Sequence, residues 1–321
     1  IIVGGSSIIS SNVSKPVVAR YSADGGIDST FNNNGIKLLW VTSLDYQYLY
    51  SIEDLAVQSN GKISAVGWRD FPSMSWSSDY WVCRINSDGT MDNTFSTDGV
   101  NVFNGSFNGN DRAYSMLLDG NNNITASGGG YLSTLYYDFS YFELNSIGES
   151  TATWATTDFG SLENDIAYGM GRDNSNRIVL GGSSGTNSAN SFAIARFNAT
   201  GTLDNSFGSN GKITTTFDGN TLNECFDIAI QQDDKIVAVG YTGNAIAIAR
   251  YLGNNVPQLN ELQLVSPADQ AVNQNYAILT FDWTDAYGAT AYAFEISTDQ
   301  AFTSPQSYTT IASMKSVSGL Q

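Results

Sequence analysis

Apolar residues alternate with small or polar residues in short runs along most of the chain. The clearest series is Ile178 to Gly182, Phe192 to Phe197, Gly211 to Phe217 and Phe226 to Gln231, and the runs are separated by Gly, Asn, Asp and Ser. A period of two indicates β-strands, whereas an amphipathic helix has a period of 3.6. The pattern therefore predicts an all-β chain with four short strands in each unit and no helix.

This unit recurs along the chain. Its marker is an Arg at the end of a run, at positions 20, 84, 196 and 250, and Glu143 takes the same place in one divergent copy. Successive markers are 64, 59, 53 and 54 residues apart, which is the length of one supersecondary unit. Four antiparallel strands per repeat make a propeller blade, so the chain is predicted to hold about 4.5 blades. Because a propeller closes with whole blades, we expect strands upstream of Ile1 to complete it.

Three of the marker arginines are followed by an Asp eight residues later. The pairs are Arg20 with Asp28, Arg84 with Asp92, and Arg196 with Asp204. The copy with Glu143 has Thr151 at this place, so Arg and Asp are lost together. We expect each pair to form an ion pair that fixes the register of a hairpin.

An aromatic residue follows three positions further on in every unit. These residues are Phe31, Phe95, Trp154 and Phe207. Packing between blades recurs in each repeat, whereas a platform for sugars need not. The aromatics are therefore predicted to fill the space between neighbouring blades.

A second recurring feature is an Asp followed two residues later by Ala. Its members are Asp54, Asp111, Asp165 and Asp227. Four equivalent carboxylates near a propeller axis would form a ring that binds a cation. Alternatively, each carboxylate accepts hydrogen bonds from backbone N–H groups where its strand begins.

These motifs resemble the bacterial delta-60 repeat family. The match is fullest at Ala195 to Gly211 and Asp227 to Gly240, and the resemblance covers about residues 1 to 252. It implies a secreted, propeller-forming protein without assigned catalytic residues. The third unit departs from the family pattern at Glu143, Ile147 and Thr151.

The pattern changes after Tyr251. We predict a partial propeller over residues 1–252, a linker over 253–262, and a fibronectin type III-like sandwich over 263–321. In the last segment Trp283 resembles the inner-strand tryptophan, and Tyr292, Phe294 and Ile296 alternate inward. Such a fold uses about 100 residues, so its final strands are expected to be missing. Repeat arrays followed by such modules resemble large surface proteins exported by type IX secretion.

Composition limits the chemistry. The net charge of −17 repels phosphate backbones and anionic membranes, and no apolar run is long enough to span a bilayer. The chain has no histidine, which excludes Ser-His-Asp and Cys-His triads and the usual zinc sites. Two cysteines cannot define a disulfide framework. We therefore predict no catalytic residues, no bound organic cofactor, no nucleic-acid partner and no membrane insertion.

Two kinds of binding site remain as candidates. Turns rich in Asp and Asn offer hard oxygen ligands for calcium, although such turns also form without metal; they contain Asp119, Asn121, Asn123, Asp173 and Asn176. Irregular insertions carry aromatic residues that can stack on sugars, namely Trp68, Trp76, Trp81, Tyr131, Tyr136 and Tyr137.

The sequence favours a non-enzymatic extracellular or cell-surface scaffold or adhesion protein, of the kind that builds matrices or filaments. Its partners would be other surface or matrix proteins. The alternative is a carbohydrate-binding or carbohydrate-cleaving propeller with glycans as partners. Saturable sugar binding or hydrolysis distinguishes the two.

Overall fold

The computed structural model describes residues 1–10, 13–39, 48–70, 78–105, 109–131, 136–160, 163–186, 188–217, 221–253, 264–266, 278–283, 292–296, 303, 306–310 and 314–318. The chain divides into two compact units, Ile1–Gly253 and Asn254–Gln321. Every regular element of these residues is a β-strand, so the prediction of an all-β fold is confirmed. The described residues contain no helix with the length and hydropathy of a membrane span.

The first unit is a series of antiparallel sheets, which we number in chain order. Sheet 1 contains β1 (Ile2–Ser10), β2 (Val13–Arg20) and β3 (Ile36–Leu38). Sheet 2 contains β4 (Leu49–Val57), β5 (Ile63–Asp70), β6 (Ser78–Ile85) and β7 (Val100–Phe103). Sheet 3 contains β8 (Arg112–Leu118), β9 (Ile124–Tyr131), β10 (Tyr137–Leu144) and β11 (Ser150–Thr157). Sheet 4 contains β12 (Asn164–Arg172), β13 (Ile178–Thr186), β14 (Ala189–Phe197) and β15 (Lys212–Thr215), and sheet 5 contains β16 (Asn223–Ile230), β17 (Ile236–Thr242) and β18 (Ala245–Tyr251).

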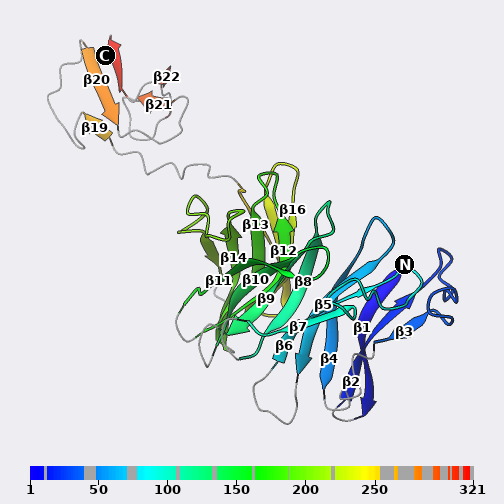
Figure 1. Ribbon diagram of the computed structural model, residues 1–321. Helices are drawn as coiled ribbons and strands as arrows, with labels where there is room; N and C mark the ends of the chain where they lie inside the picture. The colour runs from blue at the N-terminus through cyan, green and yellow to red at the C-terminus, as the bar shows by residue number, and fades with distance from the viewer. Residues whose placement is uncertain are drawn as a thin grey trace. The chain divides into compact units, whose positions relative to one another are not determined.

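Successive sheets pack through their first strands. Strand β8 lies on β4, β5 and β6 of the preceding sheet, and β12 and β16 pack in the same way one and two sheets later. The last strands contact a neighbouring sheet through single side chains, such as Trp154 of β11 against Tyr80 of β6. The sheets therefore diverge outward from β4, β8, β12 and β16, which are the inner strands, and follow one another as blades (Figure 1). This arrangement confirms the prediction of a propeller built from four-stranded blades.

The sequence repeat and the sheet are out of phase by one strand. The unit read from the sequence as Ile178 to Gln231 supplies β13, β14 and β15 to sheet 4, but its last strand, β16, begins sheet 5. Sheet 1 consequently has no inner strand, and sheet 5 has no outer one, among the described residues. Each covalent repeat thus joins two sheets.

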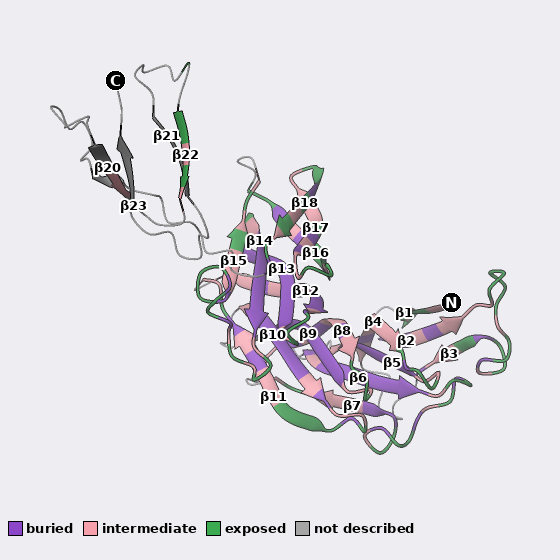
Figure 2. Ribbon diagram, turned by 90° about the horizontal axis from the view of Figure 1, so that it is seen from above, coloured by how far each residue is buried: buried purple, intermediate pink, exposed green. Residues whose placement is uncertain are grey.

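Apolar side chains fill the boundaries between sheets. Four clusters of buried residues lie one at each boundary, and the middle strands of sheets 2 to 4 are mostly buried (Figure 2). Phe31, Phe95 and Phe207 are buried at the boundary that follows their own sheet. Trp154 differs: it lies within β11 and packs at the boundary with the preceding sheet. Trp154 thus also lies between two blades, but at a different boundary from the three phenylalanines, because the third unit departs from the repeat.

The second unit contains two antiparallel sheets. One is formed by β19 (Leu264–Ser266), β20 (Ile278–Trp283) and β23 (Met314–Ser318), in that order. The other pairs β21 (Tyr292–Ile296) with β22 (Gln306–Thr310). Trp283 ends β20, and the three residues predicted to alternate inward all lie in β21.

Candidate functional site

The marker arginines bind two sheets at once. Arg84 Nε lies 2.5 Å from Asp92 Oδ2, its Nη2 donates to Thr94 Oγ1 at 3.1 Å, and its guanidinium lies over the ring of Phe95. Its Nη1 donates to the carbonyl of Ser146 in sheet 3. The arginine therefore closes its own turn and holds the next sheet, a wider role than fixing one hairpin.

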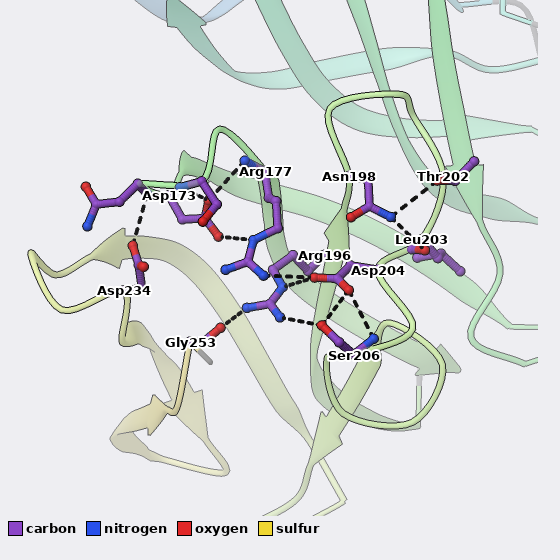
Figure 3. A network of polar contacts seen from close by, with 12 residues as sticks. Asp173, Arg177, Arg196, Asn198, Thr202, Leu203, Asp204, Ser206, Asp234 and Gly253 are labelled. Carbon is purple, nitrogen blue, oxygen red and sulfur yellow. Dashed lines mark hydrogen bonds and ion pairs between the residues drawn. The ribbon is translucent and has the colours of Figure 1, made fainter. Parts of the chain in front are cut away.

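The same arrangement is found at two other boundaries. Arg20 pairs with Asp28 at 2.8 Å and donates to the carbonyl of Ser87 in sheet 2. Arg196 pairs with Asp204 at 2.9 Å and donates to the carbonyl of Gly253, which follows sheet 5 (Figure 3). These recurring polar residues are thus engaged in joining sheets.

Charged neighbours strengthen two of the pairs. Lys62 Nζ lies 2.7 Å from Asp92, and Arg177 Nη1 lies 3.1 Å from Asp204. Burial alone would raise the pKa of Asp92, but hydrogen bonds from Lys62 and Thr94 hold it well below its ordinary value. Asp92 therefore stays ionised at any neutral or mildly acidic pH.

The four Asp residues of the second series do not form an equivalent ring. In each inner strand, one residue pairs with a glycine of the second strand just before the register shifts. Asp111 and Asp165 lie two positions before that residue. Asp54 and Asp227 come two residues after it. The prediction of one shared position was wrong, because the Asp-x-Ala spacing is the same at two different registers.

Each of these carboxylates accepts a backbone hydrogen bond. Asp111 and Asp165 accept from the N–H groups of Gly105 and Phe159, both at 2.6 Å. Asp54 accepts from Met116 at 2.8 Å, across the boundary between sheets 2 and 3, and Asp227 from Ile228 at 2.8 Å. All four carboxylates thus bind backbone N–H groups, as in the second role, but only Asp111 and Asp165 do so where their strands begin.

Every inner strand carries a β-bulge at the same place. The register shifts after Ile52, Ala113, Ala167 and Cys225, each of which pairs with a glycine of the second strand. The extra residue of each bulge is therefore Glu53, Tyr114, Tyr168 or Phe226. Bulges redirect a side chain out of the normal alternation.

Three of these bulge residues and one neighbour form a row of aromatic rings. The ring centroids of Tyr114 and Tyr168 are 5.1 Å apart, those of Tyr168 and Phe226 6.1 Å, and those of Phe226 and Tyr241 5.6 Å. The rings thus cross sheets 3, 4 and 5 along their inner strands. Phe226 is 50% exposed, and the three tyrosines are half-buried. We call Tyr114, Tyr168, Phe226 and Tyr241 the aromatic row.

Charged side chains continue the row toward sheet 2. The guanidinium of Arg112 lies 4.4 Å from the ring centroid of Trp68, and Trp68 Nε1 donates to Glu53 Oε1 at 2.7 Å. Burial raises the pKa of Tyr114 and, more strongly, that of Tyr168. Both phenols therefore stay protonated and act as hydrogen-bond donors or acceptors rather than as bases.

The aromatic residues singled out from the sequence fall into three groups. Trp81 is fully buried between sheets 1 and 2, edge-on to Tyr50, so the prediction that it stacks on a ligand is wrong. Trp68, Tyr136 and Tyr137 are half-buried, and Trp68 has Arg112 on its face. Trp76 and the side chain of Tyr131 lie outside the described residues. The aromatic row was missed, because its members lie 54, 58 and 15 residues apart in the sequence. The available signal was the aromatic that follows Ala113, Ala167 and Cys225 on three of the inner strands.

In the turns considered for calcium, the side-chain oxygens accept hydrogen bonds or form ion pairs with nearby groups of the protein. Asp119 Oδ1 accepts the N–H groups of Asn121 and Asn123, both at 2.8 Å, and its Oδ2 accepts from the Asn123 side chain. Asp173 pairs with Arg177 at 2.7 Å (Figure 3), and Asn176 Oδ1 accepts from Arg172. These contacts are those of Asx turns, which need no cation.

Three other carboxylates come together between sheets 3 and 4. Oxygen atoms of Asp138, Asp158 and Asp165 lie within 4.8 Å of one another, close enough to share one cation. Asp165 is fully buried, and burial, together with the charges of Asp158 and Asp138, raises its pKa to about 7. A proton on Asp165 therefore relieves the repulsion at neutral pH or below. The cluster joins three separate strands or loops, so no local spacing could have predicted it.

Comparison with known proteins agrees with the repeat architecture. Residues 1–31, 58–95 and 174–207 match a family described as a domain of unknown function (DUF5122) beta-propeller. The repeats are of the propeller type. Each matched segment contains two paired strands, which correspond to the second and third strands of a four-stranded sheet. It also contains an Arg–Asp pair and the phenylalanine that follows this pair. The matched segments are therefore those that join successive sheets.

Other comparisons are more distant. No curated protein sequence matches the chain significantly. A solved structure described as polysaccharide lyase Uly1 superposes with a TM-score of 0.39 and 10% identity, over 84% of this chain and 65% of that chain. The chain thus spans less than two thirds of that protein's length. Two chains this dissimilar need share no function.

Proposed function

We propose that this chain is a non-enzymatic, extracellular or cell-surface scaffold that adheres to saccharides through the aromatic row. The observation that carries the proposal is the continuous contact of Tyr114, Tyr168, Phe226 and Tyr241 across three blades. Repeats of the delta-60 kind supply the rigid frame, since the marker arginines hold the blades in place.

The row has the chemistry of a saccharide platform. Aromatic faces bind the apolar faces of sugar rings, and phenol hydroxyls can bond sugar hydroxyls at the edge. Glu53, Arg112 and Glu224 lie beside or continue the row and provide further polar groups. Because the row crosses successive sheets, it fits an extended chain of sugars better than a single residue. The net charge of −17 favours neutral or basic saccharides over polyanionic ones.

The titratable groups described along the row are its tyrosines, Glu53 and Glu224. The chain lacks histidine, and burial raises the tyrosine pKa values away from neutrality. Burial also raises the pKa of the Cys225 thiol to about 12. Asp165 titrates near neutrality but is fully buried and cannot touch a ligand. We propose binding without turnover, and recovery of the bound glycan intact tests this part of the proposal.

The second unit supports a surface location. The sheet β19–β20–β23 has the order of strands A, B and E in fibronectin type III-like modules. The hairpin β21–β22 corresponds to the edge that begins with strand C. We infer that the second unit belongs to a module of this kind. Modules of this kind space binding domains on cell surfaces.

A glycan array followed by calorimetry tests the proposal. The chain should bind an extended neutral glycan saturably, and Tyr168→Ala should weaken binding about tenfold by removing one stacking ring. Tyr308→Ala is the matched control, because Tyr308 is a tyrosine of the second unit, where its hydroxyl donates to Gln306 Oε1 at 2.7 Å. The bound glycan should be recovered intact.

Three outcomes would contradict the proposal in different ways. Absence of saturable glycan binding would remove the saccharide part and leave a scaffold that binds proteins. Equal losses in Tyr168→Ala and Tyr308→Ala would place the site elsewhere. Cleavage products that accumulate with time would show an enzyme.

A further inference from the structure

One of the four bulge residues is an acid, whereas the other three are aromatic. Glu53 takes on β4 the place that Tyr114, Tyr168 and Phe226 take on β8, β12 and β16, because each is the extra residue at the register shift of its inner strand. The side chain of Glu53 is exposed. The position in sheet 2 that corresponds to the aromatic row therefore carries a carboxylate.

This carboxylate is held next to the row. Glu53 Oε1 accepts a hydrogen bond from Trp68 Nε1 at 2.7 Å. The indole is an uncharged donor, so it orients the carboxylate without neutralising it. Burial raises the pKa of Tyr114, and the negative charge of Glu53 adds to the rise. The acid and the first ring of the row are thus close enough to act on one ligand.

A second carboxylate lies at the other end of the row. Glu224 of β16 pairs with Tyr241 of β17 in the register of sheet 5, and it is half-buried. Burial raises the pKa of Tyr241 and that of Tyr168, and the charge of Glu224 contributes in both cases. Glu224 Oε1 accepts from Asn190 Nδ2 at 3.2 Å, which is again an uncharged donor. The row thus has an acid at each end.

One basic side chain touches the same region. The guanidinium of Arg112 lies 4.4 Å from the ring centroid of Trp68, and its Nη2 lies 3.7 Å from Asp70 Oδ2. Asp70 therefore offsets the charge of Arg112, and Glu53 and Glu224 remain as additional negative charges. The region of the row consequently favours a cation.

We propose that the aromatic row selects saccharides whose units carry free, protonated amino groups. This inference rests on the proposed saccharide binding and narrows its ligand class. The faces of aromatic rings attract cations, and the carboxylates of Glu53 and Glu224 can accept charge-assisted hydrogen bonds from ammonium groups. The net charge of −17 attracts the same ligand at long range.

A polymer of amino sugars fits the row better than a lysine-rich peptide does. Each of its units presents an apolar ring face and an ammonium group, so it uses both the rings and the acids. A lysine side chain carries its charge on a flexible stem and offers no ring face to stack. Neutral sugars would make the stacking contacts alone.

Two oligomers of the same length and linkage test the inference. One consists of glucosamine units, and the other is its fully N-acetylated form, which lacks the charges. Calorimetry with the full chain is carried out at low salt and at a pH at which the amines are protonated. We expect the glucosamine oligomer to bind at least about tenfold more tightly than the N-acetylated one. Added salt should reduce this preference.

Variants of the two acids locate the effect. Glu53→Gln and Glu224→Gln should each weaken binding of the glucosamine oligomer about threefold and leave binding of the N-acetylated oligomer almost unchanged. Both variants should melt close to the wild type, because glutamine keeps an acceptor oxygen for Trp68 or Asn190. The comparison of the two oligomers on the wild type needs no variant.

Glu149→Gln is the matched control. Glu149 is exposed in the turn between β10 and β11, where its Oε2 accepts from Asn145 Nδ2 at 3.2 Å. The variant loses one negative charge, as the other two do, but away from the inner strands. It should bind both oligomers as the wild type does.

Four outcomes would overturn the inference. Equal or tighter binding of the N-acetylated oligomer would remove the selection for amines and leave saccharide binding in place. Absence of binding by both oligomers would remove the proposed saccharide binding as well. A lysine oligomer with the same number of charges that binds as tightly would show that charge alone decides. A preference unchanged in Glu53→Gln and in Glu224→Gln would place the amine site elsewhere.

Discussion

Glu143 and Arg172 form an ion pair across the boundary between sheets 3 and 4, with Oε1 and Nη2 3.5 Å apart. Glu143 occupies the place of the marker arginine, and Arg172 belongs to the inner strand of the next sheet. At this boundary an acid stands in place of the marker arginine, and its partner is a basic side chain of the next sheet. Arg172 also bonds Thr125 Oγ1 at 3.0 Å, so the connection is maintained by different residues.

Restoring the repeat residue at this position should therefore destabilise the protein. Glu143→Arg removes the pair and places two guanidinium groups near each other, which should cost about 1 kcal/mol of unfolding free energy. Adding Thr151→Asp in the same chain should recover part of the loss by supplying the missing carboxylate. Urea denaturation of both variants tests this prediction. A Glu143→Arg variant as stable as the wild type would contradict it.

Removing a marker arginine should cost more. Arg84 and Asp92 are both buried, so Arg84→Ala leaves a carboxylate with fewer partners and a carbonyl of sheet 3 without its donor. We expect a loss of about 3 kcal/mol. Arg172→Ala, at a more exposed pair, is the comparison and should lose about 1 kcal/mol or less. Equal losses would show that burial does not set the strength of the connection.

Alanine in place of a glycine opposite a bulge should cost more stability than alanine in place of a turn glycine with open space around it. Gly182→Ala forces a methyl group against the carbonyl of Ile166 and should lower stability by more than about 2 kcal/mol. Gly120→Ala should have almost no effect, because no atom lies near. Differential scanning calorimetry measures both. A stable Gly182→Ala variant would mean that the inner strand can move away.

Asp165 should make stability fall as pH rises. Its pKa of about 7 in the folded protein exceeds the value of about 3.9 of an unfolded Asp, so the folded state holds a proton that the unfolded state has lost. The resulting stabilisation is full below about pH 4 and disappears as pH rises through 7.

Asp165→Asn isolates this effect. The amide stays neutral and its oxygen can still accept the N–H of Phe159. The difference in unfolding free energy between the variant and the wild type should grow by about 2 kcal/mol in favour of the variant as pH rises from 5 to 8. Denaturation at several pH values in that interval checks it, and a constant difference would rule out the proton on Asp165.

Features within a few residues of each other could be predicted from the sequence. Arg84 and Asp92 are eight residues apart, on one strand end and the turn that follows, so the hairpin brings them together wherever the sheet lies. The alternation of apolar residues likewise predicted strands without knowledge of their partners. Trp154 was misplaced because its unit lost the local motif on which the spacing rested.

The sequence by itself determined the strand class, the repeat and the local ion pairs, because each depends on neighbours along the chain. Only the tertiary structure decided which sheet each strand joins, that the Asp-x-Ala motifs lie at two registers, and that bulges bring aromatic rings of three blades together. These features depend on the pairing of strands and on packing between sheets, where the contacting rings of Tyr114, Tyr168 and Phe226 lie more than 50 positions apart. A period of two in the apolar residues predicts which side of a strand is apolar, but pairing with the neighbouring strand sets its register.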